Sequence, residues 1–266
     1  MAELSISKAW DETRQVITRD GSLITTIALA LFVLPGVVSD LFTPSAPPGQ
    51  LPKPGAWMIL TAIALLIALA GQLAVIRLAI GSRLTVGQAI GHGARRAPAY
   101  LGATLIWVAP LSLAAVLLAG SVVGNPQASP LLALGLLVVG CIGLFLAIRM
   151  LMTSPVASAE AVGPLAILNR SWQLTSGHWL RLFGFFVLIL IGAIVTILAA
   201  SAVSGIIAQL VFGGIGALTI GGLFVALVIQ IVSAAISVVL MVMLARIYVQ
   251  LAGEGAGEVS VPTSGT

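Results

Sequence analysis

Charged side chains are scarce in this sequence, where Asp, Glu, Lys and Arg make up only 8% of the 266 residues. A soluble globular domain carries about 25% charged residues. Hydrophobic residues reach 59% here, and the mean hydropathy is +1.17. A water-soluble fold could not bury that much apolar surface, so the composition excludes a soluble globular protein and indicates a chain embedded in lipid.

Acidic residues, histidines and cysteines are also few, numbering eight, two and one. A metal-dependent phosphodiesterase needs clustered carboxylates or histidines to hold its cation, and neither His92 nor His178 has a partner at metal-ligand spacing. We therefore predict no catalytic residues, no metal site and no cofactor. Cys141 is alone, which excludes an internal disulfide. A membrane enzyme acting on phospholipid or a glycerophosphodiester is the least favoured class.

Apolar runs of membrane-spanning length occur repeatedly along the chain. A helix needs about 20 apolar residues to cross the hydrocarbon core, and we predict six such spans, near 22–42, 56–80, 99–120, 130–153, 181–204 and 216–250. Prolines between Thr43 and Pro54 exclude a helix there. Gly124-Asn125-Pro126 and Gly213-Gly214 mark two further turns on the same side. The predicted fold is an all-α polytopic bundle of six transmembrane helices.

The basic residues fall almost entirely on one side of these spans. Of the twelve Lys and Arg residues, Lys53 alone lies on the side of the proline-rich loop. Short loops rich in Lys and Arg stay in the cytoplasm, so we predict a bacterial inner-membrane protein with both termini cytoplasmic. The net charge of +4 follows from this topology, and the sequence has no soluble basic domain that would receive a nucleic acid.

An arginine in similar surroundings recurs at the end of each even-numbered span. The three endings are Ala74-Val75-Ile76-Arg77-Leu78, Leu146-Ala147-Ile148-Arg149-Met150 and Met243-Leu244-Ala245-Arg246-Ile247. A partly polar segment of helical length precedes each pair of spans, and such amphipathic segments lie in the headgroup region. We predict one membrane domain, 1–252, built from two-span repeats at 1–81, 82–153 and 154–252, each led by a cytoplasmic interfacial helix. A mobile tail, 253–266, follows.

The third leading segment carries a family resemblance. Glu160-Ala161-Val162-Gly163-Pro164 with Ala166, followed by Ser171-Trp172-Gln173-Leu174-Thr175-Ser176-Gly177-His178-Trp179-Leu180-Arg181, resembles the glycerophosphodiester phosphodiesterase membrane-domain family. Its members are bacterial six-helix membrane proteins, some of them fused to a cytoplasmic phosphodiesterase barrel. The resemblance implies the six-span layout. It does not imply the activity, because we expect no such barrel in this chain.

Seven arginines at the predicted cytoplasmic level are the candidate binding residues. They are Arg77, Arg149, Arg246, Arg95, Arg96, Arg170 and Arg181. One interpretation is that their side chains only extend to the interface, as topology requires. The other is a basic rim that binds anionic lipid headgroups or phosphate, since guanidinium pairs bidentately with phosphate oxygens. Arg95 and Arg96 have a further interpretation as a docking site for a protein partner.

Two glutamines, Gln72 and Gln230, are the candidate polar contacts inside the spans. Each is interpreted as a helix-to-helix hydrogen bond or as a substrate contact. The leading hypothesis is a non-enzymatic module that binds lipids or scaffolds a partner, and the alternative is a transporter of a small solute or lipid. A cavity ringed by Gln72 or Gln230 would favour transport. A filled interior with a basic cytoplasmic rim would favour the module.

Overall fold

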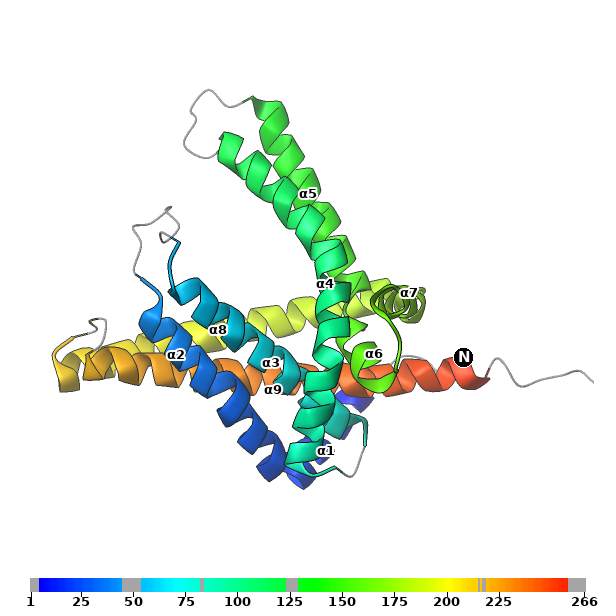
Figure 1. Cartoon of the computed structure of the whole chain (residues 1–266), viewed down its shortest axis with the longest axis horizontal. Coiled ribbons are helices and arrows are strands. Elements are labelled where there is room, and N and C mark those ends of the chain that lie inside the picture. Colours follow the sequence, from blue (N-terminus) through cyan, green and yellow to red (C-terminus); the bar gives the residue numbers. More distant parts are fainter. Residues whose placement is uncertain are drawn as a thin grey trace, which may run out of the picture.

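The computed structural model describes residues 5–44, 54–81, 84–122, 129–214, 216 and 219–257 (Figure 1). All regular elements in these ranges are helices. They are α1 (Ile6–Ala28), the π-helical η1 (Leu29–Val33), α2 (Leu34–Phe42), α3 (Trp57–Ile80), α4 (Val86–Val122), α5 (Pro130–Arg149), α6 (Thr153–Ala159), α7 (Pro164–Thr175), α8 (Trp179–Phe212) and α9 (Ile220–Gly257). The predicted all-α fold is confirmed.

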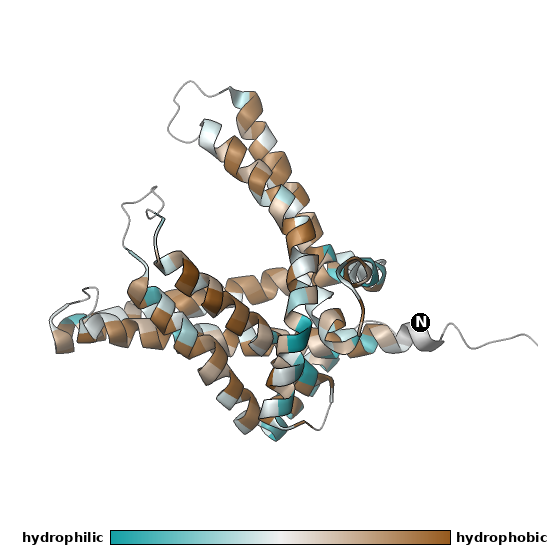
Figure 2. Cartoon of the chain, in the orientation of Figure 1, coloured by the Kyte–Doolittle hydropathy of each residue, from teal (hydrophilic) through white to brown (hydrophobic). Residues whose placement is uncertain are grey.

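Six helical stretches are long and apolar enough to cross a membrane, counted over the described residues. They are Ile6–Phe42, Trp57–Ile80, Val86–Ser121, Pro130–Ala159, Trp179–Phe212 and Ile220–Gly253. The predicted number of spans is therefore confirmed. Hydrophobic residues dominate these helices along most of their length (Figure 2). Most of the predicted loop between the first two spans, and the turn at Gly124-Asn125-Pro126, lie outside the described residues.

Helix boundaries differ from the predicted spans mainly at the basic ends. The leading segments of the first two predicted repeats are continuous with their spans, in the unbroken helix 6–42 and in α4. The third is a separate helix, α7, because Gly177 takes a positive φ of 83° before α8 begins. Whether these segments lie in a headgroup region stays a prediction.

Two helices run further than predicted. α8 continues to Phe212, beyond the predicted end at 204. The polar Ser204 does not interrupt this helix, since its hydroxyl donates to the Ala200 carbonyl of the same helix, 2.6 Å away. Gly213, with φ of 76°, ends it at the predicted turn. α9 continues to Gly257, past the predicted domain end at 252. The predicted tail from 258 onward lies outside the described residues.

The spans form three hairpins that meet at one end (Figure 1). The α4–α5 hairpin diverges from the other two, whereas the first hairpin stays in contact with α9 as far as Asp40 and Gln230. The helix 6–42 pairs with α3, α4 pairs with α5, and α8 pairs with α9. α6 and α7 pack where the hairpins meet. Both ends of the described chain also lie there, since the Ser5 amide donates to Gln250 Oε1 over 3.4 Å. We call this shared end the base.

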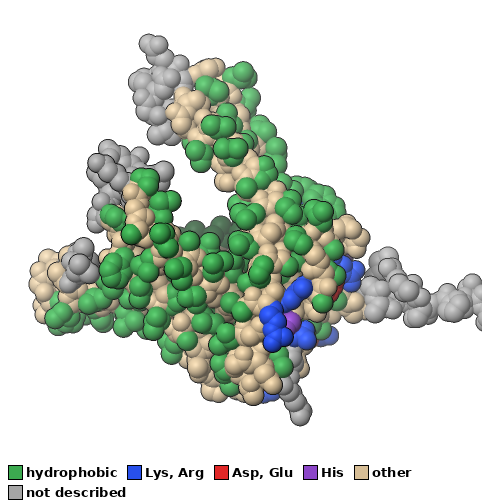
Figure 3. Space-filling view, viewed as in Figure 1, with side chains coloured by type: hydrophobic (Ala, Val, Ile, Leu, Met, Phe, Trp, Pro, Cys, Tyr) green, Lys and Arg blue, Asp and Glu red, His purple; other side chains and the backbone are tan. Residues whose placement is uncertain are grey.

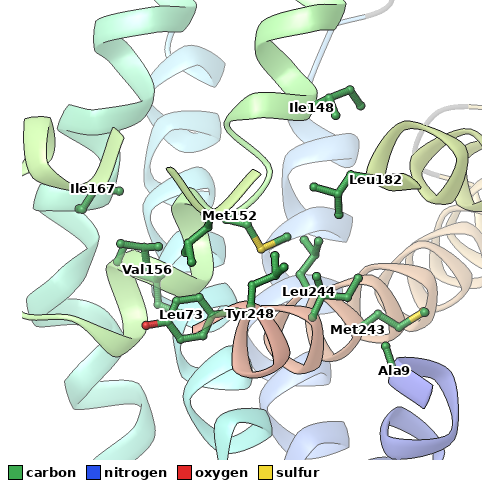
Figure 4. Close-up of a cluster of buried hydrophobic side chains, with 14 of the residues drawn as sticks. Ala9, Leu73, Ile148, Met152, Val156, Ile167, Leu182, Met243, Leu244 and Tyr248 are labelled. Atoms are coloured by element: carbon green, nitrogen blue, oxygen red, sulfur yellow. The ribbon is translucent and has the colours of Figure 1, made fainter. Parts of the chain in front are cut away.

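The buried core lies at the base and not at the middle of the spans. Figure 4 shows side chains from every hairpin and from the short helices converging in one cluster, among them Ala9, Leu73, Ile148, Met152, Val156, Ile167, Leu182 and Tyr248. A second cluster joins α1, α3 and α9 through Ile27, Val75, Ile76 and Val242. The backbones of α3 and α4 approach closely at Gly93, where any side chain would collide with the Ala70 carbonyl. The base is therefore the part that tertiary packing holds together.

Away from the base, apolar side chains cover the outside of the hairpins (Figure 3). Leu113, Leu117, Leu131 and Leu137 of the α4–α5 hairpin are 61–74% exposed. Exposure of such a continuous apolar surface to water is unfavourable, whereas contact with apolar lipid chains carries no such free-energy penalty. The divergent parts of the hairpins are accordingly lipid-facing.

Candidate functional site

Most of the candidate arginines come together at the base. They form three separate groups of contacts, which we together call the basic junction: Arg96 and Arg170 with Glu160 and Tyr248, Arg246 with Glu12, and Arg149 with the rings of Phe145 and Trp172. Figure 3 shows Lys and Arg side chains gathered in this part of the visible face, around a histidine. The contacts of each arginine decide whether it is available to a ligand.

Arg96 closes the end of the short helix α6. It donates to three carbonyls: from Nε to Ala157 at 2.9 Å, and from Nη2 to Glu160 and, at 3.0 Å, to Val162. His92, one turn earlier on α4, places Nε2 2.8 Å from the Ser158 carbonyl. The last carbonyls of a helix have no partner within it. Both side chains therefore satisfy the backbone of α6 and its following turn, and join them to α4.

Glu160 connects three elements of the junction. Its Oε1 accepts from Arg170 Nε of α7 at 3.2 Å and from the Tyr248 hydroxyl of α9 at 2.9 Å. Glu160 itself follows α6 directly. The carboxylate thus ties the α6–α7 turn to α7 and to the last span.

Arg246 holds the last span against the first. Its Nε donates to Glu12 Oε2 of α1 at 2.7 Å, and Nη1 donates to the Ala79 carbonyl of α3 at 3.4 Å. The two side chains of the ion pair are 21% and 20% exposed. Their partial burial makes this pair less screened by solvent than a surface salt bridge.

Arg149 is held by aromatic rings. The guanidinium carbon lies 4.8 Å from the ring centroid of Trp172 and 5.5 Å from that of Phe145. Nη1 donates to Ser176 Oγ at 3.2 Å. A cation over an aromatic face is attracted by the ring quadrupole. Arg149 consequently fastens the end of α5 to α7.

The other three candidate arginines differ in exposure. Arg77 is half-buried in the last turn of α3, and Arg181 is exposed near the start of α8. Arg95 is exposed, and it makes no hydrogen bond or ion pair with any part of the chain that the structure describes. Of the adjacent pair on α4, Arg96 is thus occupied by protein and Arg95 is open to a ligand.

Both candidate glutamines form hydrogen bonds between helices. Gln72 Nε2 donates to the Tyr100 hydroxyl of α4 at 3.3 Å. Gln230 Nε2 of α9 donates to Asp40 Oδ2 of α2 at 2.7 Å. The sequence pattern does not predict the pairing of Gln230 with Asp40. The presence of a lone acid at the end of the first predicted span was the signal that could have suggested a polar partner.

Gln230 also borders an open cavity of about 310 Å³ between α2, α3 and α9, which is not enclosed by the helices. Its polar lining comes from Ser39, Thr61, Gln230, Ser233 and Ser237, and its apolar lining includes Phe32 and Leu65. The three serines were not predicted as site residues, since nothing in their local sequence shows that they share one cavity.

Six membrane-length apolar helices around a polar base define the class of this protein: it is a multi-pass α-helical membrane protein. No family model, curated protein or solved structure matches the chain. Within the described ranges, no three His, Cys, Asp or Glu side chains are grouped as they would be around a metal ion.

Proposed function

We propose that this protein is a lipid-binding membrane module. The supporting observation is the divergence of the α4–α5 hairpin, which leaves large apolar side chains such as Leu117 and Leu131 exposed at 66% and 74%. Acyl chains fill the space beside these surfaces in a bilayer. A protein whose spans are joined mainly at one end presents more of this surface than a closed bundle does.

The proposed headgroup contact is Arg95. Its guanidinium is exposed, while the neighbouring Arg96 keeps this part of α4 fixed against α6. A guanidinium offers parallel N–H donors that match two phosphate oxygens. Arg95 would therefore bind the phosphate of an anionic lipid at the level of the basic junction.

The proposal includes an orientation. Short segments rich in Lys and Arg stay cytoplasmic, which would put the base and both termini on the cytoplasmic side of a bacterial inner membrane. The resemblance to the glycerophosphodiester phosphodiesterase membrane domains is consistent with this layout. Reporter fusions at each end of the chain test it: a reporter active only in the cytoplasm should work at both ends, and activity of a periplasm-specific reporter would reverse the orientation.

Native mass spectrometry of protein released gently from its own membranes tests the lipid contact. We expect Arg95→Gln to lower the retained anionic lipid several-fold. Arg14→Gln is the matched control, because Arg14 is another exposed arginine at the base, on α1. Equal anionic lipid on the folded Arg95→Gln protein and on the wild type would refute the proposal. Loss of a co-purified protein instead of lipid would favour partner docking at Arg95.

Transport is the second candidate function. The cavity beside Gln230 favours it, because a carrier needs a polar site within its spans. Flux of small solutes into proteoliposomes tests this candidate. A flux that Gln230→Leu abolishes, with folding retained, would establish transport, whereas no flux above that of protein-free vesicles for a panel of solutes would leave the lipid module as the function.

A further inference from the structure

His92 lies between two arginines on the surface of α4. Arg95 follows it by three residues and Arg96 by four, and residues at these spacings are neighbours on one face of an α-helix. Figure 3 shows Lys and Arg side chains around a histidine in this part of the molecule. A guanidinium group therefore flanks the imidazole on each side.

The contact with α6 decides which nitrogen of this imidazole is free. The Ser158 carbonyl can only accept a hydrogen bond, so Nε2 of His92, 2.8 Å away, carries the proton of that bond. Nδ1 makes no hydrogen bond within the described part of the chain, and it is not sealed from solvent. The ring is thus held in one orientation, with Nδ1 open to a ligand.

The charges around this imidazole favour an anion. Arg95 is exposed, and Arg96 uses Nε and Nη2 for carbonyls, while its Nη1 makes no hydrogen bond within the described ranges. The carboxylate of Glu160, the acid that follows α6, is already paired with Arg170 and Tyr248. The carbonyls at the end of α6, which would repel an anion, already accept hydrogen bonds from α4. An incoming anion therefore meets donors and positive charge.

We propose that this face of α4 recognises a phosphate monoester and distinguishes it from a phosphate diester. This recognition rests on the proposed phosphate contact of Arg95 and adds the class of phosphate. A diester has two non-bridging oxygens, which the Arg95 guanidinium can bind with two parallel hydrogen bonds. A monoester has a third non-bridging oxygen, and Nδ1 of His92 is the partner for it.

The additional bond contains one shared proton. If the monoester keeps its second proton, its P–OH group donates to neutral Nδ1; if the monoester is a dianion, protonated Nδ1 donates to the oxygen. A diester has neither a P–OH group nor a third non-bridging oxygen, so it cannot form this bond in either state. The monoester belongs either to the headgroup of phosphatidic acid or to a soluble molecule.

The first experiment places the full chain in nanodiscs that contain equal amounts of phosphatidic acid, a monoester, and phosphatidylglycerol, a diester, and measures retained lipid by native mass spectrometry. We expect about tenfold preference for phosphatidic acid, because the diester lacks one charge-assisted hydrogen bond. His92→Gln should remove this preference, since the Gln amide can still donate to the Ser158 carbonyl but offers no counterpart of Nδ1. His178→Gln changes the other histidine of the chain and is the matched control, which should keep the preference.

Failure of this assignment can be told apart from failure of the Arg95 contact. If Arg95→Gln retains as much anionic lipid as the wild type, the phosphate contact itself is wrong. If Arg95→Gln lowers the retention of both lipids but the wild type retains them equally, the monoester assignment alone is wrong. A preference that came only from the larger charge of phosphatidic acid would persist in His92→Gln, and that result also overturns the assignment. The wild-type comparison needs no variant, so it decides even if His92→Gln does not fold.

The second experiment adds methyl phosphate or dimethyl phosphate to the purified protein and measures the melting temperature. Stabilisation by methyl phosphate, absent with dimethyl phosphate and lost in His92→Gln, identifies a soluble monoester as a ligand. A preference for phosphatidic acid without such stabilisation identifies the lipid headgroup. If neither experiment distinguishes a monoester from a diester, the proposal is wrong.

Discussion

Arg95 and Arg96 are consecutive on α4 but have opposite environments: Arg96 places Nε 2.9 Å from the Ala157 carbonyl, whereas Arg95 is exposed. The same residue type therefore has two roles at adjacent positions. Arg96 belongs to the packing of the base, and Arg95 belongs to its surface.

This contrast predicts different effects of two matched substitutions. Arg96→Gln should lower the free energy of unfolding in detergent by about 3 kcal/mol, because charged hydrogen bonds to the carbonyls that follow α6 are lost. Arg95→Gln should change it by less than about 0.5 kcal/mol. Unfolding titrations measure both. Equal stability of the two variants would contradict the capping role of Arg96.

Glycines on α4 provide a second matched pair. Gly93→Ala should destabilise the protein by about 2 kcal/mol, because the added methyl group collides with the α3 backbone at Ala70. Gly91→Ala meets open space, and should stabilise α4 by about 0.5 kcal/mol through helix propensity. Thermal unfolding of both variants measures the difference. A neutral Gly93→Ala would show that α3 and α4 do not approach as closely as the structure has them.

The ion pair between Glu12 and Arg246 should be measurable by a double-mutant cycle. The two side chains are 20% and 21% exposed, so we expect a coupling energy of about 1 kcal/mol, at the upper end for solvent-accessible pairs. The cycle uses Glu12→Gln, Arg246→Gln and the double variant. Additive effects of the two single substitutions would mean that this ion pair makes no net contribution to the contact between α1 and α9.

Tyr248→Phe tests the Glu160 contact. Removing the hydroxyl that donates to Glu160 Oε1 over 2.9 Å should cost about 1 kcal/mol, since the carboxylate loses one donor. The ring is kept, so packing in the core is unchanged. If Tyr248→Phe unfolds at the same denaturant concentration as the wild type, the hydroxyl makes no net contribution to the base.

The sequence predicted the number and type of spans but not all of their limits. Residues 57–80 form a helix almost as predicted, because an apolar run between a proline-rich segment and Gly81 gives clear local signals. The fifth span was predicted to end near 204, whereas α8 continues to Phe212 with the Ser204 hydroxyl bonded to the Ala200 carbonyl of its own helix. Local composition cannot report where a hydroxyl finds its partner.

The candidate residues show a similar division. The arginine pattern identified one end of the spans as basic, and the structure places four of these arginines in contacts between helices at the base. Their partners could not be predicted: Arg246 contacts Glu12, and Gln230 contacts Asp40, across long stretches of chain. Arg95 and Arg96 were equivalent in sequence, and only the position of α6 made them different.

By itself, the sequence determined that the chain belongs in a bilayer as six helices, since hydropathy and span length are local properties of each segment. The tertiary structure decided that these helices are joined at the base and that the α4–α5 hairpin diverges from the other two beyond it. It also decided which polar groups meet in the basic junction and beside Gln230. Those pairings depend on how helices far apart in the chain pack together, and a sequence pattern contains no direct information on that packing.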